Sequence, residues 1–240
     1  MPSPLRLALQ FLTRLPVHAD DHAPDTVGRS LLWYPVVGAL VGVLLLAVAA
    51  LVEAPIAGAG IVLLAWVAVT GALHLDGLGD LADAWVGGHD DAERTLAIMK
   101  DIHAGPMAVA AIAAVLIAKF AAVAALLGEQ GPVAVLFAPI LARAAVPVML
   151  MGTPYVRSAG IGSAMAENLP RKGTRWMLGI TAAIVLLALG WDGIAMILAA
   201  LAVTLLLRRS LLKRIGGTTG DCLGALIELV EVAVLYAALV

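Results

Sequence analysis

The sequence has few charged residues, few aromatic residues and a single cysteine. Only 13% of its 240 residues are charged and 5% are aromatic, whereas a soluble domain carries about 25% charged residues. The lone Cys222 excludes an intramolecular disulfide and a cysteine-based metal cluster. The net charge of −2 gives no reason to expect nucleic acid as a partner. This scarcity of charge excludes an ordinary soluble enzyme.

Apolar residues make up most of the chain. They account for 62% of it, and the mean hydropathy is +1.01. Runs of about 17–25 apolar residues are typical of membrane-spanning helices. The sequence predicts an all-α polytopic membrane protein, with one integral-membrane catalytic domain over residues 1–240 that contacts the lipid bilayer. The seven predicted spans are 31–52, 55–73, 106–127, 132–151, 175–190, 192–208 and 222–240. The fifth and sixth are short, which leaves a tilted or re-entrant hairpin open there.

The basic residues fall on one side of the predicted membrane. The connections at 53–54, 128–131 and 191–193 contain no Lys or Arg. Thirteen of the fifteen basic residues, all except Lys119 and Arg143, lie in the other connections or at the span ends beside them. By the positive-inside rule, that side is the cytoplasm. This predicts a multi-pass protein of the cytoplasmic (inner) membrane with a cytoplasmic N-terminus, an outer C-terminus and an active site that faces the cytoplasm.

Residues 1–30 precede the first predicted span. They contain no sustained apolar core followed by a small-residue cleavage site, so we expect no secretory signal peptide. Leu5, Leu9 and Leu12 fall on one side of a short helix. An amphipathic segment on the membrane surface is predicted, and an ordinary packed helix is an open alternative.

Three aspartates follow the second apolar run. Asp76, Asp80 and Asp83 take positions i, i+4 and i+7 of a predicted helix, within about 60° of one another around its axis. Three carboxylates on one face repel unless a cation neutralises them. Oxygen ligands without a cysteine favour magnesium or manganese over zinc. The alternative is a helix start, with Asp76 as N-cap and a solvated acidic face.

These aspartates belong to a predicted cytoplasmic loop, 74–105. A loop of about thirty residues in a compact protein is usually functional. Its first residue, His74, has the pattern of a core or capping histidine and is also a candidate for substrate binding. Arg94 and Lys100 are candidates for phosphate contact, or alternatively members of ion pairs on an amphipathic helix.

Four charged residues fall inside predicted spans, where each costs about 2.5–3.5 kcal/mol. Structural pairing of Lys119 or Arg143 with Glu231 is one explanation, and Lys119 could also reach the outer interface. Substrate binding is open for Arg143. Glu228 forms an i, i+7 pair with Asp221, which predicts a second acidic helix face on the cytoplasmic side.

The segment Gly216-Gly-Thr-Thr-Gly-Asp221 precedes the last predicted span. Free backbone N–H groups at Thr219 and Gly220 would form an anion-binding turn at a positive helix end, although a plain glycine-rich turn fits equally well. Metal carboxylates, basic residues and such a turn at a membrane face suit phosphoryl transfer from a diphosphate.

Five stretches resemble the cobalamin synthase family, in order from residue 11 to residue 231. They are Phe11-Leu-Thr-Arg-Leu-Pro-Val17, Tyr34-Pro-Val-Val-Gly38, Thr70-Gly-Ala-Leu-His-Leu-Asp-Gly-Leu-Gly-Asp-Leu-Ala-Asp-Ala84, Ile98-Met-Lys-Asp101 and Thr219-Gly-Asp-Cys-Leu-Gly-Ala225 with Glu228. The chain departs from the family pattern at Ile102-His-Ala-Gly105, where Ser-Arg-Ile-Gly is usual, and at Ala72. The missing arginine removes a phosphate contact at position 103, where His103 could still donate a hydrogen bond.

The resemblance implies a magnesium-dependent membrane enzyme of late cobalamin assembly. It would join adenosylcobinamide-GDP to α-ribazole, or to its 5′-phosphate, and release GMP. The metal ligands would be Asp76, Asp80, Asp83, Asp221 and Glu228. The catalytic residues would be Asp80, Asp101, Arg94 and Lys100, with Asp101 as the candidate base for a ribose hydroxyl. The substrate-binding residues would be His74, His103, Thr219, Gly220 and Arg143.

Two other classes stay open. A CDP-alcohol phosphotransferase also gathers aspartates at a membrane face, but its Asp-x-x-Asp-Gly-x-x-Ala-Arg start is absent here. A transporter would use the charges inside the spans as a pathway, yet it would not explain the acidic loop. A homo-oligomer is compatible with the sequence.

Overall fold

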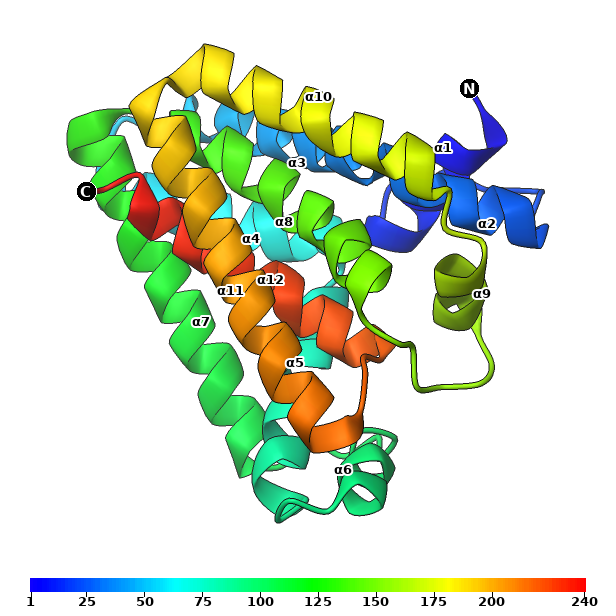
Figure 1. Cartoon of the computed structure of the whole chain (residues 1–240). Helices are drawn as coiled ribbons and strands as arrows, with labels where there is room; N and C mark the ends of the chain where they lie inside the picture. Colours follow the sequence, from blue (N-terminus) through cyan, green and yellow to red (C-terminus); the bar gives the residue numbers. More distant parts are fainter.

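The computed structural model describes residues 1–240, except for the side chains of Glu129 and Gln130. Helices form nearly all of the regular structure, and one isolated bridge joins two loops (Figure 1). In chain order the helices are α1 (Ser3–Leu12), α2 (Pro24–Ser30), the 3-10 helix η1 (Leu31–Trp33), α3 (Tyr34–Ala49), α4 (Pro55–Thr70), α5 (Leu73–Gly87), α6 (Ala92–Ile98), α7 (Pro106–Ala125), the π-helix η2 (Leu126–Gln130), α8 (Val133–Gly152), α9 (Ile161–Glu167), α10 (Arg171–Leu189), α11 (Trp191–Ile215) and α12 (Gly220–Ala237).

Five helical stretches are long and apolar enough to cross a membrane. They are Pro24–Ala49, Pro106–Gly128, α8, α10 and α11. Helix α4 reaches that length only together with α5, from which it is bent by 87°, and this pair would bring the number to six. Helix α12 carries three carboxylates. The all-α, multi-pass prediction is confirmed. The count of seven spans is not, and the orientation in the membrane stays a prediction.

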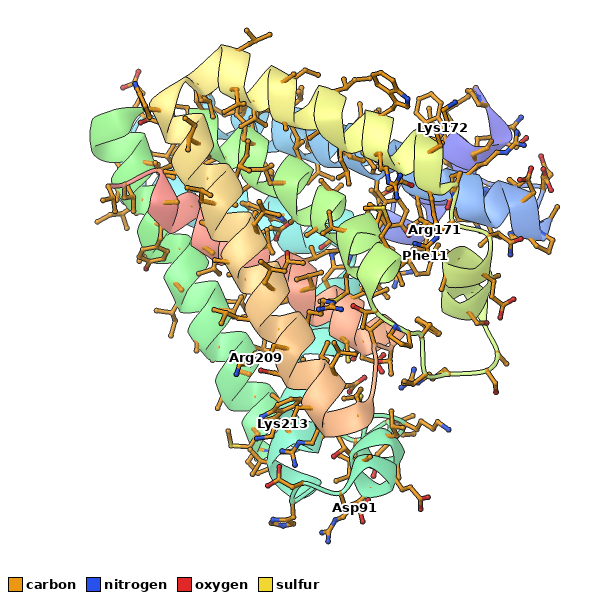
Figure 2. The ribbon with its side chains drawn as sticks, in the orientation of Figure 1. Phe11, Asp91, Arg171, Lys172, Arg209 and Lys213 are labelled. Carbon is orange, nitrogen blue, oxygen red and sulfur yellow. The ribbon has the colours of Figure 1, made fainter. Side chains whose placement is uncertain are left out.

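The three connections without basic residues gather at one end of the molecule. There, Gly128 lies near Pro55, and Leu126, Leu189 and Ala238 line one cavity. The C-terminus lies at this end, whereas the N-terminus, α6 and α9 lie away from it (Figure 1). Figure 2 places several basic side chains away from it as well, namely Arg171, Lys172, Arg209 and Lys213. The predicted separation of charge is therefore present in the fold.

Helix α12 forms the centre of the bundle, where it packs against α5, α7, α8 and α11 (Figure 1). Helix α3 packs closely on α8 through two glycines at a Gly-x-x-x-Gly spacing. A Cβ atom on Gly38 or Gly42 would lie 2.4 Å from the carbonyl oxygen of Pro139 or Leu136, respectively. Such small-residue seams are the usual means by which helices approach closely in a membrane.

Helix α1 is a packed helix, because Leu7, Leu9 and Leu12 are buried. It leads to Arg14, whose backbone N–H donates to the carbonyl of Val69, 2.7 Å away, at the end of α4. Helix α1 is therefore packed on the bundle, and its position at the membrane surface stays a prediction.

The bend between α4 and α5 comes from two consecutive residues in the left-handed conformation. Gly71 has φ +63° and Ala72 has φ +57°. Glycine adopts this conformation freely, whereas alanine does so at a cost of about 1–2 kcal/mol. The bend turns α5 away from α4, so the predicted loop 74–105 is folded as two helices, α5 and α6, with a turn after each.

Candidate active site

Helices α5 and α12 touch along their backbones. A Cβ atom on Gly77 would lie 2.7 Å from the carbonyl oxygen of Asp221, and one on Gly224 would lie 3.3 Å from that of His74. The two glycines therefore allow the acidic face of α5 to lie directly beside the first turn of α12. This brings the start of α12 beside the acidic face of α5, the two segments whose carboxylates are predicted from the sequence to share one metal site.

Alanine at position 77 is expected to separate these helices. Its Cβ meets backbone atoms, which cannot move aside, so we expect a loss of about 1–3 kcal/mol. Gly79→Ala is the matched control on the same helix. The two atoms nearest to its Cβ belong to the side chains of Ala108 and Ile112, at 3.1 and 3.2 Å, and the nearest backbone atom lies at 3.7 Å. Thermal unfolding of the purified variants in detergent measures the difference. Equal unfolding temperatures for the two variants would contradict the close approach.

The carboxylate of Asp80 lies in a strongly acidic environment. Burial, together with the charges of Asp76 and Asp221, raises the pKa of Asp80 to about 6, and Arg157 acts in the opposite direction. Among the described side chains, no three metal-ligating groups lie close enough to enclose an ion. Magnesium is usually held by one or two carboxylates together with substrate phosphates. Asp76 and Asp80, with Asp221 nearby, therefore suit a magnesium ion that arrives with a phosphorylated substrate.

The structure gives Asp83 a different partner. Its carboxylate accepts hydrogen bonds from the backbone N–H groups of Gly105, at 2.5 Å, and Ala108, at 3.0 Å. These groups lie at the start of α7, where N–H groups have no partner within the helix. Asp83 thus caps α7 in this structure and ties the acidic helix to it.

Glu228 lies in a buried network of four charges instead of with the aspartates. Lys119 of α7 bonds to Glu228 at 2.6 Å and also to Glu231, and Arg143 of α8 bonds to Glu231 at 2.5 Å. The Lys119 ammonium also lies over the ring of Trp66. The predicted pairing of Lys119 and Arg143 with Glu231 is confirmed. Lys119 is only 2% exposed, so it does not reach the outer interface.

Two loops form a short parallel pairing beside the acidic helices. Val156 N–H donates to Thr218 at 3.0 Å, and Thr218 N–H donates to Pro154 at 2.8 Å. Gly217 makes this possible, because a Cβ atom there would lie 2.3 Å from the carbonyl oxygen of Pro154. The pairing holds the loop after α8 against the start of α12.

The same pairing positions Arg157, a residue that no sequence pattern predicts for the site. Its guanidinium forms an ion pair with Asp221 at 2.5 Å and donates to the carbonyl of Met99. Arg157 lines three cavities, one of which also contains Lys100. The sequence signal was weak: Arg157 stands alone in a Gly- and Ser-rich connection, and no spacing relates it to Asp221.

The turn after α6 carries two predicted residues, Asp101 and His103. Asp101 accepts from the backbone N–H of His103 at 3.0 Å, and the His103 ring lies 2.7 Å from the same oxygen. These hydrogen bonds lower the pKa of Asp101, which makes its carboxylate a weaker proton acceptor. Both side chains are exposed, as is Arg94 on α6.

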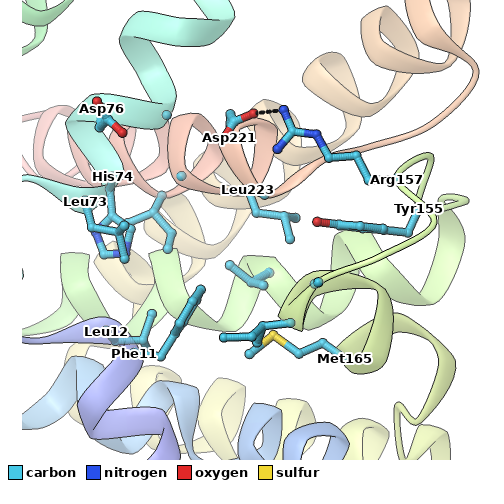
Figure 3. A pocket seen from close by; sticks show the side chains of 18 of the residues that line it. Phe11, Leu12, Leu73, His74, Asp76, Tyr155, Arg157, Met165, Asp221 and Leu223 are labelled. Atoms are coloured by element: carbon cyan, nitrogen blue, oxygen red, sulfur yellow. Dashed lines mark hydrogen bonds and ion pairs between the residues drawn. The ribbon is translucent and has the colours of Figure 1, made fainter. Parts of the chain in front are cut away.

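Thr219 and Gly220 begin α12, as predicted for a helix N-terminus. The Thr219 hydroxyl accepts from the backbone N–H of Cys222 at 3.3 Å and so serves as N-cap. Gly220 lines a cavity of about 320 Å³ together with His74, Asp76, Arg157 and Asp221 (Figure 3). The carboxylates, the guanidinium and the helix start thus surround one cavity.

Comparison with known proteins gives a consistent match. The family model described as cobalamin-5-phosphate synthase matches residues 4–239. The adenosylcobinamide-GDP ribazoletransferases of Pseudomonas paraeruginosa and Ectopseudomonas mendocina are each 50% identical to the chain, and that of Pseudomonas aeruginosa strain PAO1 is 51% identical. Each alignment covers 97% of this chain and 96% of the relative. No solved structure matches. The chain belongs to the cobalamin-5-phosphate synthase family.

Proposed function

We propose that the protein transfers the cobinamide phosphate of adenosylcobinamide-GDP to α-ribazole, or to α-ribazole 5′-phosphate, and releases GMP. The observation that carries this proposal is the match to relatives of that activity over almost the whole chain. The placement of Asp76, Asp221 and Arg157 around one cavity supports it, as does Asp80, whose carboxylate interacts electrostatically with all three. Family membership argues against the CDP-alcohol phosphotransferase and transporter alternatives.

The reaction is a substitution at the phosphorus that carries the cobinamide. A ribose hydroxyl of α-ribazole forms a new P–O bond, the anhydride P–O bond breaks, and GMP leaves with the bridging oxygen. The hydroxyl proton passes to a base. Such a step depends mainly on positioning and on stabilising the phosphate charge.

The acidic residues would hold the cofactor. Magnesium, when bound, would neutralise the diphosphate and stabilise the leaving phosphate. Asp76 and Asp80 supply the carboxylates on α5, and Asp221 supplies one on α12. Asp83 and Glu228 are bonded elsewhere in this structure, so we assign them supporting roles.

Arg157 is the basic residue best placed to bind the diphosphate. Its guanidinium offers paired N–H donors, which match phosphate geometry, and it now neutralises Asp221. Arg157 would turn from Asp221 toward the substrate diphosphate when Asp221 serves as a metal ligand. Lys100 lies along an adjoining cavity, and the backbone at Thr219 and Gly220 offers a positive helix end. We place this site on the cytoplasmic side, where the basic residues gather.

Transfer by the purified full-length protein tests the proposal. Incubation with adenosylcobinamide-GDP, α-ribazole and magnesium should release one GMP for each molecule of completed corrinoid. Chelation of magnesium should reduce turnover to background, and added magnesium should restore it, because the diphosphate charge is otherwise uncompensated. Absence of GMP release would overturn the transfer itself, whereas full turnover after chelation would overturn only the role of the metal.

A further inference from the structure

The cavity beside the acidic helices has two different ends. Most of its wall is apolar and comes from α1, α8, α9 and α12: Phe11, Leu12, Val146, Met165, Leu223 and Ile227. Figure 3 shows Phe11, Leu12 and Met165 on the side away from Asp76 and Asp221, with Leu223 between these two groups. The polar end holds Asp76 and the Asp221–Arg157 ion pair. A ligand that fits would be apolar at one end and would present its reacting group at the other.

His74 is a buried polar group in the wall of this cavity. It is 3% exposed, and neither of its ring nitrogens has a hydrogen-bond partner among the described residues. Buried polar atoms without partners are rare and costly in folded proteins. A ligand in the cavity would supply the missing partner, and an imidazole N–H suits a ligand with a bare ring nitrogen.

The size of the cavity limits what it can hold. Its volume of about 320 Å³ is at the lower end of the roughly 300–1,000 Å³ found for small-molecule sites. A corrin macrocycle is far larger than such a space. Guanine would fit by size, but its edge carries several hydrogen-bond donors and acceptors, and the apolar wall would leave most of them unpaired.

We propose that this cavity binds the benzimidazole base of α-ribazole and holds the ribose hydroxyl at the polar end; this inference rests on the proposed function. The base is a flat fused ring with two methyl groups, and one of its ring nitrogens is free once the other carries the ribose. The apolar wall accommodates the ring and methyl groups, and His74 donates a hydrogen bond to the free nitrogen. The hydroxyl then faces the site at Asp76, Asp80 and Arg157.

Filling the cavity tests the inference without turnover. Equilibrium dialysis of α-ribazole alone against the purified full-length protein should show binding that Leu223→Trp weakens about tenfold or more. Leu206→Trp is the matched control, because Leu206 is 66% exposed on α11 and the same substitution there leaves the cavity intact. Phe11→Ala, which widens the cavity and removes a ring from its wall, should also weaken binding. Equal affinities in all four proteins would overturn the inference.

Steady-state kinetics test which of the two substrates occupies the cavity. Leu223→Trp and His74→Phe should raise KM for α-ribazole about tenfold or more, and should change KM for adenosylcobinamide-GDP by less than about twofold. If KM rises only for adenosylcobinamide-GDP, the cavity binds guanine. If KM rises equally for both substrates, the cavity is specific to neither. Either result overturns the inference. If the wild type binds α-ribazole in this cavity but transfers nothing, the proposed function fails and the binding site remains.

Discussion

Asparagine at position 80 is expected to lower ribazole transfer by at least about 100-fold while the protein stays folded. Burial and the charges of Asp76 and Asp221 disfavour the ionised form of Asp80, and a cation bound beside these carboxylates would favour it. Asparagine keeps the shape of the side chain but removes the charge that would hold magnesium. The residual activity of Asp80→Asn should require a higher magnesium concentration than the activity of the wild type does. The measurement is GMP release across a magnesium titration.

Asp91→Asn is the matched control for this experiment. Asp91 belongs to the same acidic segment, but its side chain is the N-cap of α6, where it accepts from Arg94 N–H at 3.0 Å. Asparagine caps helices as well as aspartate does, so activity should stay near that of the wild type. Near-normal rates for Asp80→Asn at low magnesium would contradict the metal site.

Replacement of Glu231 by leucine is expected to destabilise the protein by about 3–5 kcal/mol. Glu231 bonds to both Lys119 and Arg143, and all three side chains are fully buried or nearly so. Its loss leaves two buried cations with one carboxylate, Glu228. For a protein of this size we expect the apparent unfolding temperature in detergent to fall by about 10 °C or more.

A second replacement separates charge balance from packing. Arg143→Leu in the Glu231→Leu background removes the unpaired cation and leaves the Lys119–Glu228 pair, which is electrically neutral. Charge pairs replaced by apolar residues are often tolerated, so much of the lost stability should return. If the double variant is less stable than Glu231→Leu alone, packing and not charge balance explains the network.

The helices were predictable because apolar runs and caps are local properties of the chain. All seven predicted spans contain a helix at the expected place, and the aspartates of α5 share a helix as their spacing required. The span count was not predictable, because it depends on tertiary structure. The left-handed pair Gly71–Ala72 bends one apolar run away from its acidic continuation. The buried carboxylates Glu228 and Glu231 of α12 are compensated by residues more than eighty positions earlier in the sequence.

The residue types of the candidate site were predictable from the sequence, but the hydrogen-bond and ion-pair partners of these residues were predictable only in part. Asp76, Asp80 and Asp221 could be proposed from spacing and from the family resemblance. The partners of Asp83 and Glu228 could not, because the N-terminus of α7 and the ammonium of Lys119 approach them only in the folded bundle. Arg157 was not predictable for the same reason. Its position depends on a short pairing between two loops, which is possible only because Gly217 has no side chain.

The four-charge network also bears on how the chain enters the bilayer during synthesis. Each acidic residue near the middle of a helix opposes insertion by about 2.5–3.5 kcal/mol, so α12 alone would be a poor substrate for the insertion machinery. Its cationic partners lie in α7 and α8, which are synthesised earlier and therefore precede it. We therefore expect α12 to insert against α7 and α8, so that its insertion into the bilayer and its packing in the bundle occur together.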